Sequence, residues 1–116
     1  MIDVVNIALA LLTIALGAFG FLAPRYTAAA LDLKVGDSTM GLSEMRASVG
    51  GLFVAIGLAC LITGAPWAYG MLGVAYAGAA AGRMLSIFLD KPPIKKAVVF
   101  WAFEAIPAAW LIWANL

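Results

Sequence analysis

The 116-residue sequence contains no histidine and a single cysteine, Cys60. An intramolecular disulfide and a CxxC redox centre each need two cysteines, so both are excluded. Zinc sites built from histidine and cysteine, and histidine-ligated haem, need ligands that this chain lacks, and the sequence predicts no metal site and no cofactor. Charge is also scarce, because only 11% of the residues are Asp, Glu, Lys or Arg and the formal net charge is +1. Such a chain offers no basic field for nucleic acid.

Apolar residues dominate what is present. Hydrophobic residues make up 66% of the chain and the mean hydropathy is +1.06, whereas a soluble domain is about 45 to 50% apolar. One membrane crossing needs about 20 apolar residues, so we expect four spans, at residues 3–23, 44–64, 67–89 and 97–115. The predicted fold is all-α: a single integral membrane four-helix bundle that accounts for the 116 residues.

Proline and glycine punctuate the apolar runs. Pro24 is expected to stop the first helix, because proline donates no backbone hydrogen bond and restricts the residue before it. The second span is expected to begin near Ser43 and to end in a tight turn at residues 64–66. The loop from residue 25 to 43 is expected to contain a short interfacial helix that Gly36 would end.

Small residues recur at helical spacing in the second and third spans. Gly50 and Gly57 lie seven residues apart, Gly51 belongs to a second stripe of small residues, and Gly78 and Gly82 form a GxxxG pattern. Small residues let helix backbones approach closely in lipid, where no hydrophobic force drives one helix onto another. These five glycines are therefore predicted to be helix-packing positions.

Two ionisable residues lie inside the last two spans. Arg83 precedes Asp90 by seven residues, and Glu104 follows Lys96 by eight. At about 1.5 Å of rise per residue, both side chains lie roughly 10 to 12 Å below the connecting loop. A charge at such a depth costs about 2.5 to 3.5 kcal/mol on insertion scales. An antiparallel hairpin would bring the two to one level, so we expect them to form an ion pair.

Two interpretations of this pair remain open. In the first it is a structural ion pair that fixes helix register, which is the better attested role. In the second it lines a pocket reached from the cytoplasmic face, because Tyr76, Arg83 and Asp90 are spaced by sevens along one helix face. Arg46 either snorkels to the interface or joins the cluster, where two arginines around one carboxylate would suit an anionic headgroup. The candidate polar cluster consists of Arg46, Tyr76, Arg83, Asp90 and Glu104.

The basic residues indicate an orientation. All seven Lys and Arg lie on or near the loops 25–46 and 90–96, which four crossings place on one face. The positive-inside rule makes that face cytoplasmic and puts both termini outside. The opposite interface is expected to carry an aromatic belt of Trp67, Tyr69, Trp110 and Trp113.

Three stretches have a recognisable pattern: SEMRASVGGLFVAIGL, AAGRMLSIFLDKPP and WAFEAIPAAW. They resemble the DUF4345 family of small bacterial four-helix membrane proteins, from the Pro24 end of the first helix to the last helix. The GRxLS pattern before an acidic loop is the most specific part of this resemblance. The family is similar to the wider DoxX-like group in architecture and is defined as a domain of unknown function. The resemblance therefore implies a fold and a bacterial inner membrane location, but no chemistry. The matching positions are Arg46, Gly50, Gly51, Arg83, Asp90 and Glu104, and Lys91 stands where an Asp-Gly turn is expected.

Three classes of function are compatible with the sequence. The first is a structural or accessory bundle that associates with a membrane-protein partner, with copies of itself and with the lipid bilayer. The second is a binding or transport module that holds an amphiphile, a lipid or a quinone, near Arg46, Arg83 and Glu104. A membrane enzyme is the least supported, because Glu104 is the one deep carboxylate and the chain offers no histidine, paired acid or cofactor motif. The sequence favours the accessory bundle and predicts no catalytic residue.

Overall fold

The computed structural model describes residues 2–116, and every regular element in this range is a helix. Four helical stretches are long and apolar enough to cross a membrane: Ile2–Leu22, Met40–Thr63, Pro66–Leu89 and Ile94–Asn115. The all-α class is therefore confirmed, and four helices have the length and apolar composition that a membrane span needs. Four such helices are the pattern of a multi-pass membrane protein.

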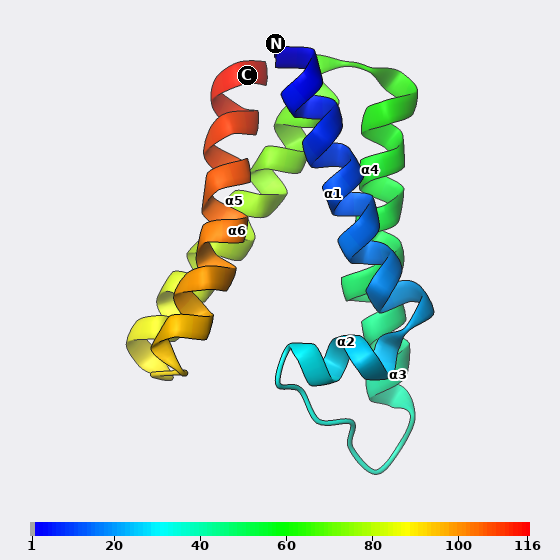
Figure 1. Cartoon of the computed structure of the whole chain (residues 1–116), viewed down its shortest axis with the longest axis vertical. Helices are drawn as coiled ribbons and strands as arrows, with labels where there is room; N and C mark the ends of the chain where they lie inside the picture. Colours follow the sequence, from blue (N-terminus) through cyan, green and yellow to red (C-terminus); the bar gives the residue numbers. More distant parts are fainter. Residues whose placement is uncertain (1) are drawn as a thin grey trace. The chain divides into compact units, whose positions relative to one another are not determined.

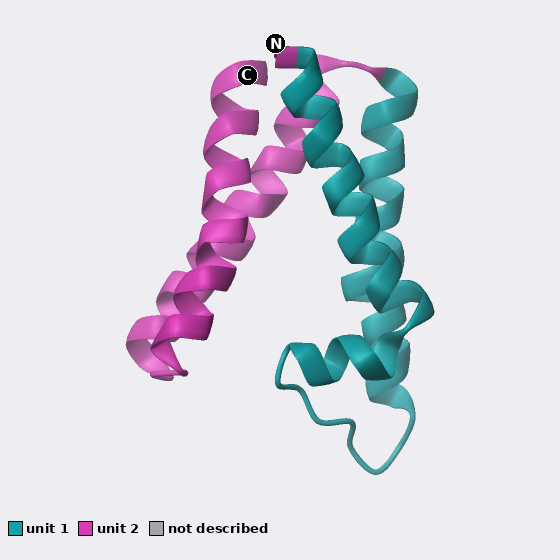
Figure 2. Cartoon of the chain, in the orientation of Figure 1, with its two compact units in different colours: residues 1, 3–63 teal, residues 2, 64–116 magenta. Residues whose placement is uncertain are grey.

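The helices group into two compact units, which are drawn in Figures 1 and 2. The N-terminal unit comprises Asp3–Thr63, and the C-terminal unit comprises Gly64–Leu116. Each unit contains two of the four long helical stretches and has its own internal packing.

The N-terminal unit begins with α1 (Ile2–Leu22) and continues through the short helix α2 (Pro24–Ala30). Three further elements follow one another without a break: α3 (Met40–Glu44), the π-helix η1 (Met45–Gly51) and α4 (Leu52–Thr63). The second span therefore begins at the start of α3, a few residues earlier than the sequence predicted.

Pro24 separates α1 from α2 and also begins α2. It occupies the first position of that helix, where its missing N–H would have no acceptor within the helix. The short helix predicted in this stretch therefore exists, but it ends at Ala30, because the chain turns at Leu31 and Asp32. Asp32 has a φ of 61°, a left-handed conformation that aspartate tolerates better than most residues.

Glycines let the long helices of the N-terminal unit approach at backbone distance. A Cβ added to Gly17 of α1 would lie 2.9 Å from the carbonyl oxygen of Gly50, and one added to Gly57 would lie 3.0 Å from that of Ala10. A Cβ added to Gly50 would overlap the backbone nitrogen of Phe21. The structure thus places Gly50 and Gly57 in this helix contact, together with Gly17, which the small-residue pattern did not indicate.

Replacing Gly50 with alanine is expected to destabilise the protein. The new Cβ would meet the backbone of Phe21, which cannot rotate away as a side chain can, so the helices must shift at a cost of about 1 to 3 kcal/mol. Gly51→Ala is the matched control, because its Cβ would lie 3.4 Å from the carbonyl oxygen of Arg46 and 3.6 Å from the Phe21 ring. Thermal unfolding in detergent should show a lower Tm for Gly50→Ala alone. Equal midpoints would contradict the close contact.

The C-terminal unit is an antiparallel hairpin of α5 (Pro66–Leu89) and α6 (Ile94–Asn115), which lie side by side in Figure 1. Pro93 is the N-cap residue of α6, so this helix begins a few residues earlier than predicted. The buried side chains Leu72 and Leu111 come from α5 and α6 respectively.

The GxxxG pair of α5 takes no part in the hairpin contact. A Cβ added at Gly78 or Gly82 would meet no atom within 4 Å. Each glycine is two residues from Ala80, which is buried, and two residues turn the chain by about 200° around the helix axis. Both glycines therefore lie on the side of α5 opposite Ala80. Within this unit the packing role belongs instead to positions such as Gly73, where an added Cβ would lie 2.8 Å from the Cβ of Leu111.

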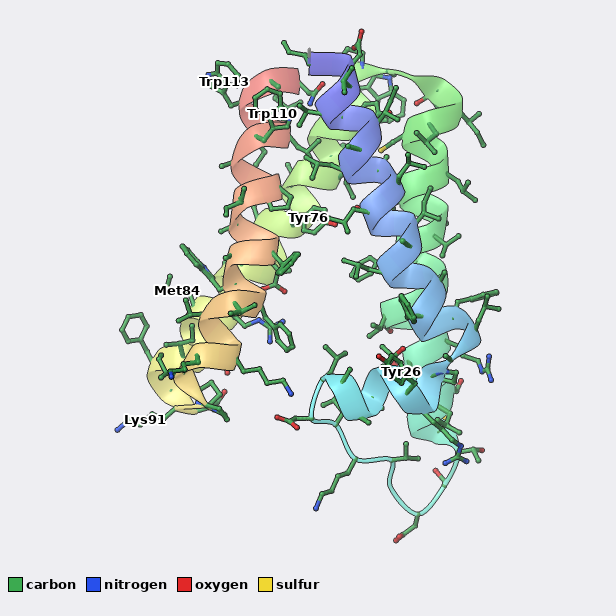
Figure 3. All side chains as sticks on the ribbon, viewed as in Figure 1. Tyr26, Tyr76, Met84, Lys91, Trp110 and Trp113 are labelled. Atoms are coloured by element: carbon green, nitrogen blue, oxygen red, sulfur yellow. The ribbon has the colours of Figure 1, made fainter. Side chains whose placement is uncertain are left out.

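The two ends of the hairpin differ in composition, as Figure 3 shows. Lys91 lies in the connecting loop, whereas Trp110 and Trp113 lie near the C-terminal end of α6 with their ring centroids 5.6 Å apart. Basic residues and aromatic rings are typical of the two interfaces that a membrane-spanning segment reaches. The hairpin thus has the polarity expected of a pair of crossing helices.

The α5–α6 loop contains one residue in an unfavourable backbone conformation. Lys91 has a φ of 49°, in the left-handed region that an L side chain disfavours by about 1 to 2 kcal/mol. Glycine adopts this conformation without a Cβ penalty, which explains why an Asp-Gly turn is expected here.

Lys91→Gly is expected to raise the free energy of unfolding by about 0.5 to 1 kcal/mol, after allowance for the larger backbone entropy of glycine in the unfolded chain. Lys95→Gly is the control, because Lys95 lies inside α6, where glycine should lower the free energy of unfolding by about 1 kcal/mol. Chemical denaturation in detergent measures both. A loss of stability in both variants would show that the Lys91 side chain contributes more than its backbone conformation costs.

Candidate functional site

Arg83 of α5 and Glu104 of α6 form a bidentate ion pair. Arg83 Nε donates to Glu104 Oε1 at 3.0 Å, and Arg83 Nη2 donates to Glu104 Oε2 at 2.9 Å. Two parallel hydrogen bonds fix the orientation of the guanidinium as well as its position. The ion pair predicted from the sequence is confirmed.

The two residues meet because side chains lean toward the N-terminus of their own helix. Arg83 lies six residues before the last residue of α5, about 9 Å below the loop, and it leans away from the loop. Glu104 lies ten residues after the first residue of α6, about 15 Å below the loop, and it leans back toward the loop. The two backbone positions therefore lie at different depths below the loop, contrary to the sequence prediction. The side chains still meet, because they lean in opposite directions along the hairpin.

Phe100 brings a second cation close to this pair. The Arg83 Cζ lies 5.3 Å from the centroid of the Phe100 ring, and the Lys96 Nζ lies 5.8 Å from the same centroid. Both distances fall within the range of cation–π attraction. Lys96, Phe100 and Glu104 are spaced by fours and so share one face of α6. Phe100 was not predicted as a site residue, although this spacing was visible in the sequence.

Arg83 is the more exposed member of the ion pair. The exposed fraction of the Arg83 side chain is 35%, and that of Glu104 is 16%. A guanidinium carries five N–H donors, and the bonds to Glu104 use two of them. Over residues 2–116, the hydrogen bonds of the Arg83 side chain all go to Glu104, which leaves both N–H groups of Nη1 without an acceptor. The site can therefore donate further hydrogen bonds from a fixed positive charge.

Two other candidates lie on the same helix as Arg83. Asp90, at the end of α5, is exposed and accepts a hydrogen bond from Ser86 Oγ at 2.8 Å. Tyr76 is half-buried and lies two turns before Arg83 on the same side of α5. Among the described residues, no group of three or more His, Cys, Asp or Glu side chains is placed to hold a metal ion. Of the predicted cluster, Arg83 and Glu104 are joined by hydrogen bonds.

Arg46 belongs to the N-terminal unit, where it caps a helix. Its Nη1 donates to the carbonyl oxygen of Phe21 at 2.7 Å. Phe21 lies in the last turn of α1, where carbonyl groups lack intrahelical donors, and the break at Pro24 ends the helix there. A positive charge is also favourable at a helix C-terminus. This contact gives Arg46 a structural role that its sequence position did not indicate.

The sequence matches the family model described as "Domain of unknown function (DUF4345)" over residues 2–115. The chain belongs to this family. The match includes the first helix of the DUF4345 protein, which the resemblance found in the sequence did not use. No curated protein and no solved structure matches the chain. The family therefore supplies no chemistry.

Removing one partner of the ion pair is expected to destabilise the DUF4345 protein. Arg83→Met leaves a buried carboxylate and Glu104→Leu leaves an unpaired guanidinium, each at a cost of at most about 3 to 5 kcal/mol, since Arg83 is partly exposed. The double variant replaces both charges with apolar groups and should recover much of that loss.

A double-mutant cycle of thermal unfolding in detergent measures the coupling between Arg83 and Glu104. Recovery in the double variant is the expected result. Losses that simply add would mean that the two side chains do not interact in the protein.

Proposed function

We propose that this DUF4345 protein binds an amphiphile, a lipid or a quinone, at Arg83 of the α5–α6 hairpin. One observation carries the proposal: a guanidinium inside a membrane-spanning helix is held by Glu104, yet its Nη1 donors have no acceptor in the described chain. Unpaired polar groups are costly in hydrocarbon. A bound polar head would supply the acceptors that the hairpin lacks.

The direction of the arginine side chain supports this proposal. An arginine near a helix end ordinarily snorkels to the nearest interface, which satisfies its donors with water and headgroups. Arg83 instead points along α5 away from the loop, where Glu104 fixes it. The large apolar residues Phe88 and Phe103 are exposed on the same two helices, so acyl or isoprenoid chains would find apolar surface along the hairpin.

A structural or accessory bundle is the second candidate, and it is the one that the sequence favours. The open face of Gly78 and Gly82 supports it, because an added Cβ at either position meets no atom within 4 Å. Such a face would allow a helix of a membrane-protein partner, or of a second copy, to approach closely. The unfilled donors of Arg83 favour amphiphile binding over the accessory bundle.

We infer that the protein resides in the bacterial inner membrane with the α5–α6 loop in the cytoplasm and both termini outside. Lys91 of that loop and Lys95 and Lys96 at the start of α6 support this orientation through the positive-inside rule. No catalytic role is proposed for Glu104, because both of its carboxylate oxygens bind Arg83.

The amphiphile is tested with the double variant Arg83→Met/Glu104→Leu, which should be folded but empty. Wild type and variant are purified in mild detergent, and lipids and quinones are extracted and quantified per mole of protein by mass spectrometry. We expect one compound to be enriched with the wild type and lost from the double variant.

The control is Arg25→Gln, which removes an exposed arginine from the N-terminal unit and should retain the compound. A stable double variant that keeps the native amount of amphiphile would reject the proposal and leave the accessory bundle as the better account.

A further inference from the structure

We infer that the amphiphile binds Arg83 through an uncharged carbonyl oxygen. The inference rests on the function proposed above and narrows it, because it excludes ligands that bind through a carboxylate or a phosphate. Two kinds of amphiphile carry such an oxygen next to an apolar chain: a quinone has it on its ring, and a neutral lipid has it in its ester groups. Either oxygen would accept from the same donors of the guanidinium.

The ion pair leaves one edge of the guanidinium open. Arg83 uses its Nε–H and one N–H of Nη2 for the two oxygens of Glu104. Two N–H groups of Nη1 and one of Nη2 therefore have no acceptor among the described residues. Because the guanidinium is planar, one N–H of each nitrogen lies on the open edge. A carbonyl oxygen has two lone pairs and can accept both of these hydrogen bonds.

Glu104 already balances the charge of Arg83. Both of its oxygens accept from the guanidinium, and its side chain is only 16% exposed. An anion at the open edge would be attracted by Arg83 but repelled by the carboxylate on the other edge of the same guanidinium. It would also lose its hydration, which is the main cost of burying a charge. A carbonyl oxygen carries no net charge and avoids both penalties.

The depth of Arg83 also favours an uncharged head. Helix α5 has 24 residues and is about 36 Å long, slightly more than the roughly 30 Å hydrocarbon core of a bilayer. Arg83 lies six residues before the last residue of α5, about 9 Å from that end, and its side chain leans toward the middle of the helix. Its donors therefore lie within the hydrocarbon, below the layer that holds lipid phosphates. A carbonyl group reaches this depth without bringing a charge with it.

Phe100 adds an apolar wall to the site. The centroid of its ring lies 5.3 Å from Arg83 Cζ, within the range of cation–π attraction. A ring at this distance displaces water from the guanidinium. Hydrogen bonds at the open edge are then stronger than they would be in water, because the local dielectric constant is lower.

The test uses two ligands that share an acyl chain and differ in charge. At about pH 9 oleate is an anion, whereas methyl oleate is an uncharged ester. Decylubiquinone is the quinone probe. The affinity of each probe for the full wild-type chain is obtained from the rise in Tm with probe concentration in a non-ionic detergent.

We expect at least one uncharged probe to bind about tenfold or more tightly than oleate, because an anion must be desolvated and is repelled by Glu104. Tighter binding of decylubiquinone than of methyl oleate would identify the oxygen as that of a quinone, and the reverse order would identify a lipid ester. Oleate binding as tightly as both uncharged probes would overturn the inference. So would the absence of any rise in Tm with methyl oleate and decylubiquinone.

Two variants locate the bound probe. Arg83→Met/Glu104→Leu removes the donors and should weaken binding of the uncharged probe by about tenfold or more, the loss expected for hydrogen bonds from a charged donor. Lys96→Gln removes a neighbouring cation, whose Nζ lies 5.8 Å from the Phe100 centroid, and should change the affinity by less than about twofold. A tenfold loss in Lys96→Gln would indicate an anionic head and reject the inference. Circular dichroism of both variants should match the wild type.

The outcomes separate this inference from the proposed function. If the double variant loses the compound that co-purifies with the wild type, but oleate is the tightest of the three probes, the proposed function stands and the present inference fails. If the double variant keeps that compound and binds the uncharged probe as tightly as the wild type, both fail. The comparison of the three probes on the wild type needs no variant, so it tests the inference even where the double variant does not fold.

Discussion

The cost of an unsatisfied polar group in hydrocarbon constrains this structure more than any other interaction. Polar side chains of the long helices therefore make hydrogen bonds within the protein. Thr13 and Thr63 donate from their hydroxyl groups to carbonyl oxygens four residues earlier, Arg46 donates to the last turn of α1, and Glu104 accepts two bonds from Arg83. Each of these bonds is made within one unit, so neither hairpin depends on the other for them. The Nη1 donors of Arg83 have no such acceptor among the described residues, and the proposed function depends on them.

Hydropathy and residue spacing were sufficient to predict the four long apolar helices and the ion pair, because both depend on one-dimensional properties of the chain. The number of apolar residues sets the number of crossings, and the positions of Arg83 and Glu104 relative to one short loop set their pairing. Helix ends were less predictable. Met40 and Ile94 begin their helices a few residues before the predicted spans, because polar residues continue a helix beyond the apolar core and only the core is visible to hydropathy.

Close packing contacts between helices could not be predicted, since the spacing of small residues does not say which face of a helix meets a neighbour. Gly50 and Gly78 both belong to small-residue patterns, but an added Cβ would overlap the backbone at Gly50 and meet nothing at Gly78. The cap that Arg46 places on Phe21 depends on where two helices cross, and residue spacing does not record that crossing. The contact of Arg83 with the Phe100 ring likewise needs α5 and α6 in their observed register. The charges of the site were thus predictable, and the aromatic and backbone groups that complete it were not.

The two units also show that packing alone does not account for the ion pair. In the N-terminal unit, α1 packs through Gly17, Gly50 and Gly57 at backbone distance, without a charged pair between α1 and α4 in the described residues. Replacing a buried ion pair by apolar residues of similar size is often neutral or stabilising. Apolar residues at positions 83 and 104 would therefore fix the register of the two helices equally well. The hairpin instead carries two charges that cost about 2.5 to 3.5 kcal/mol each on insertion. The ion pair of Glu104 with Arg83 offsets part of that cost. Beyond packing, the pair supplies an oriented guanidinium whose Nη1 donors can bind a ligand. The retained charges therefore favour a role for Arg83 in recognition, with Glu104 as the residue that positions it.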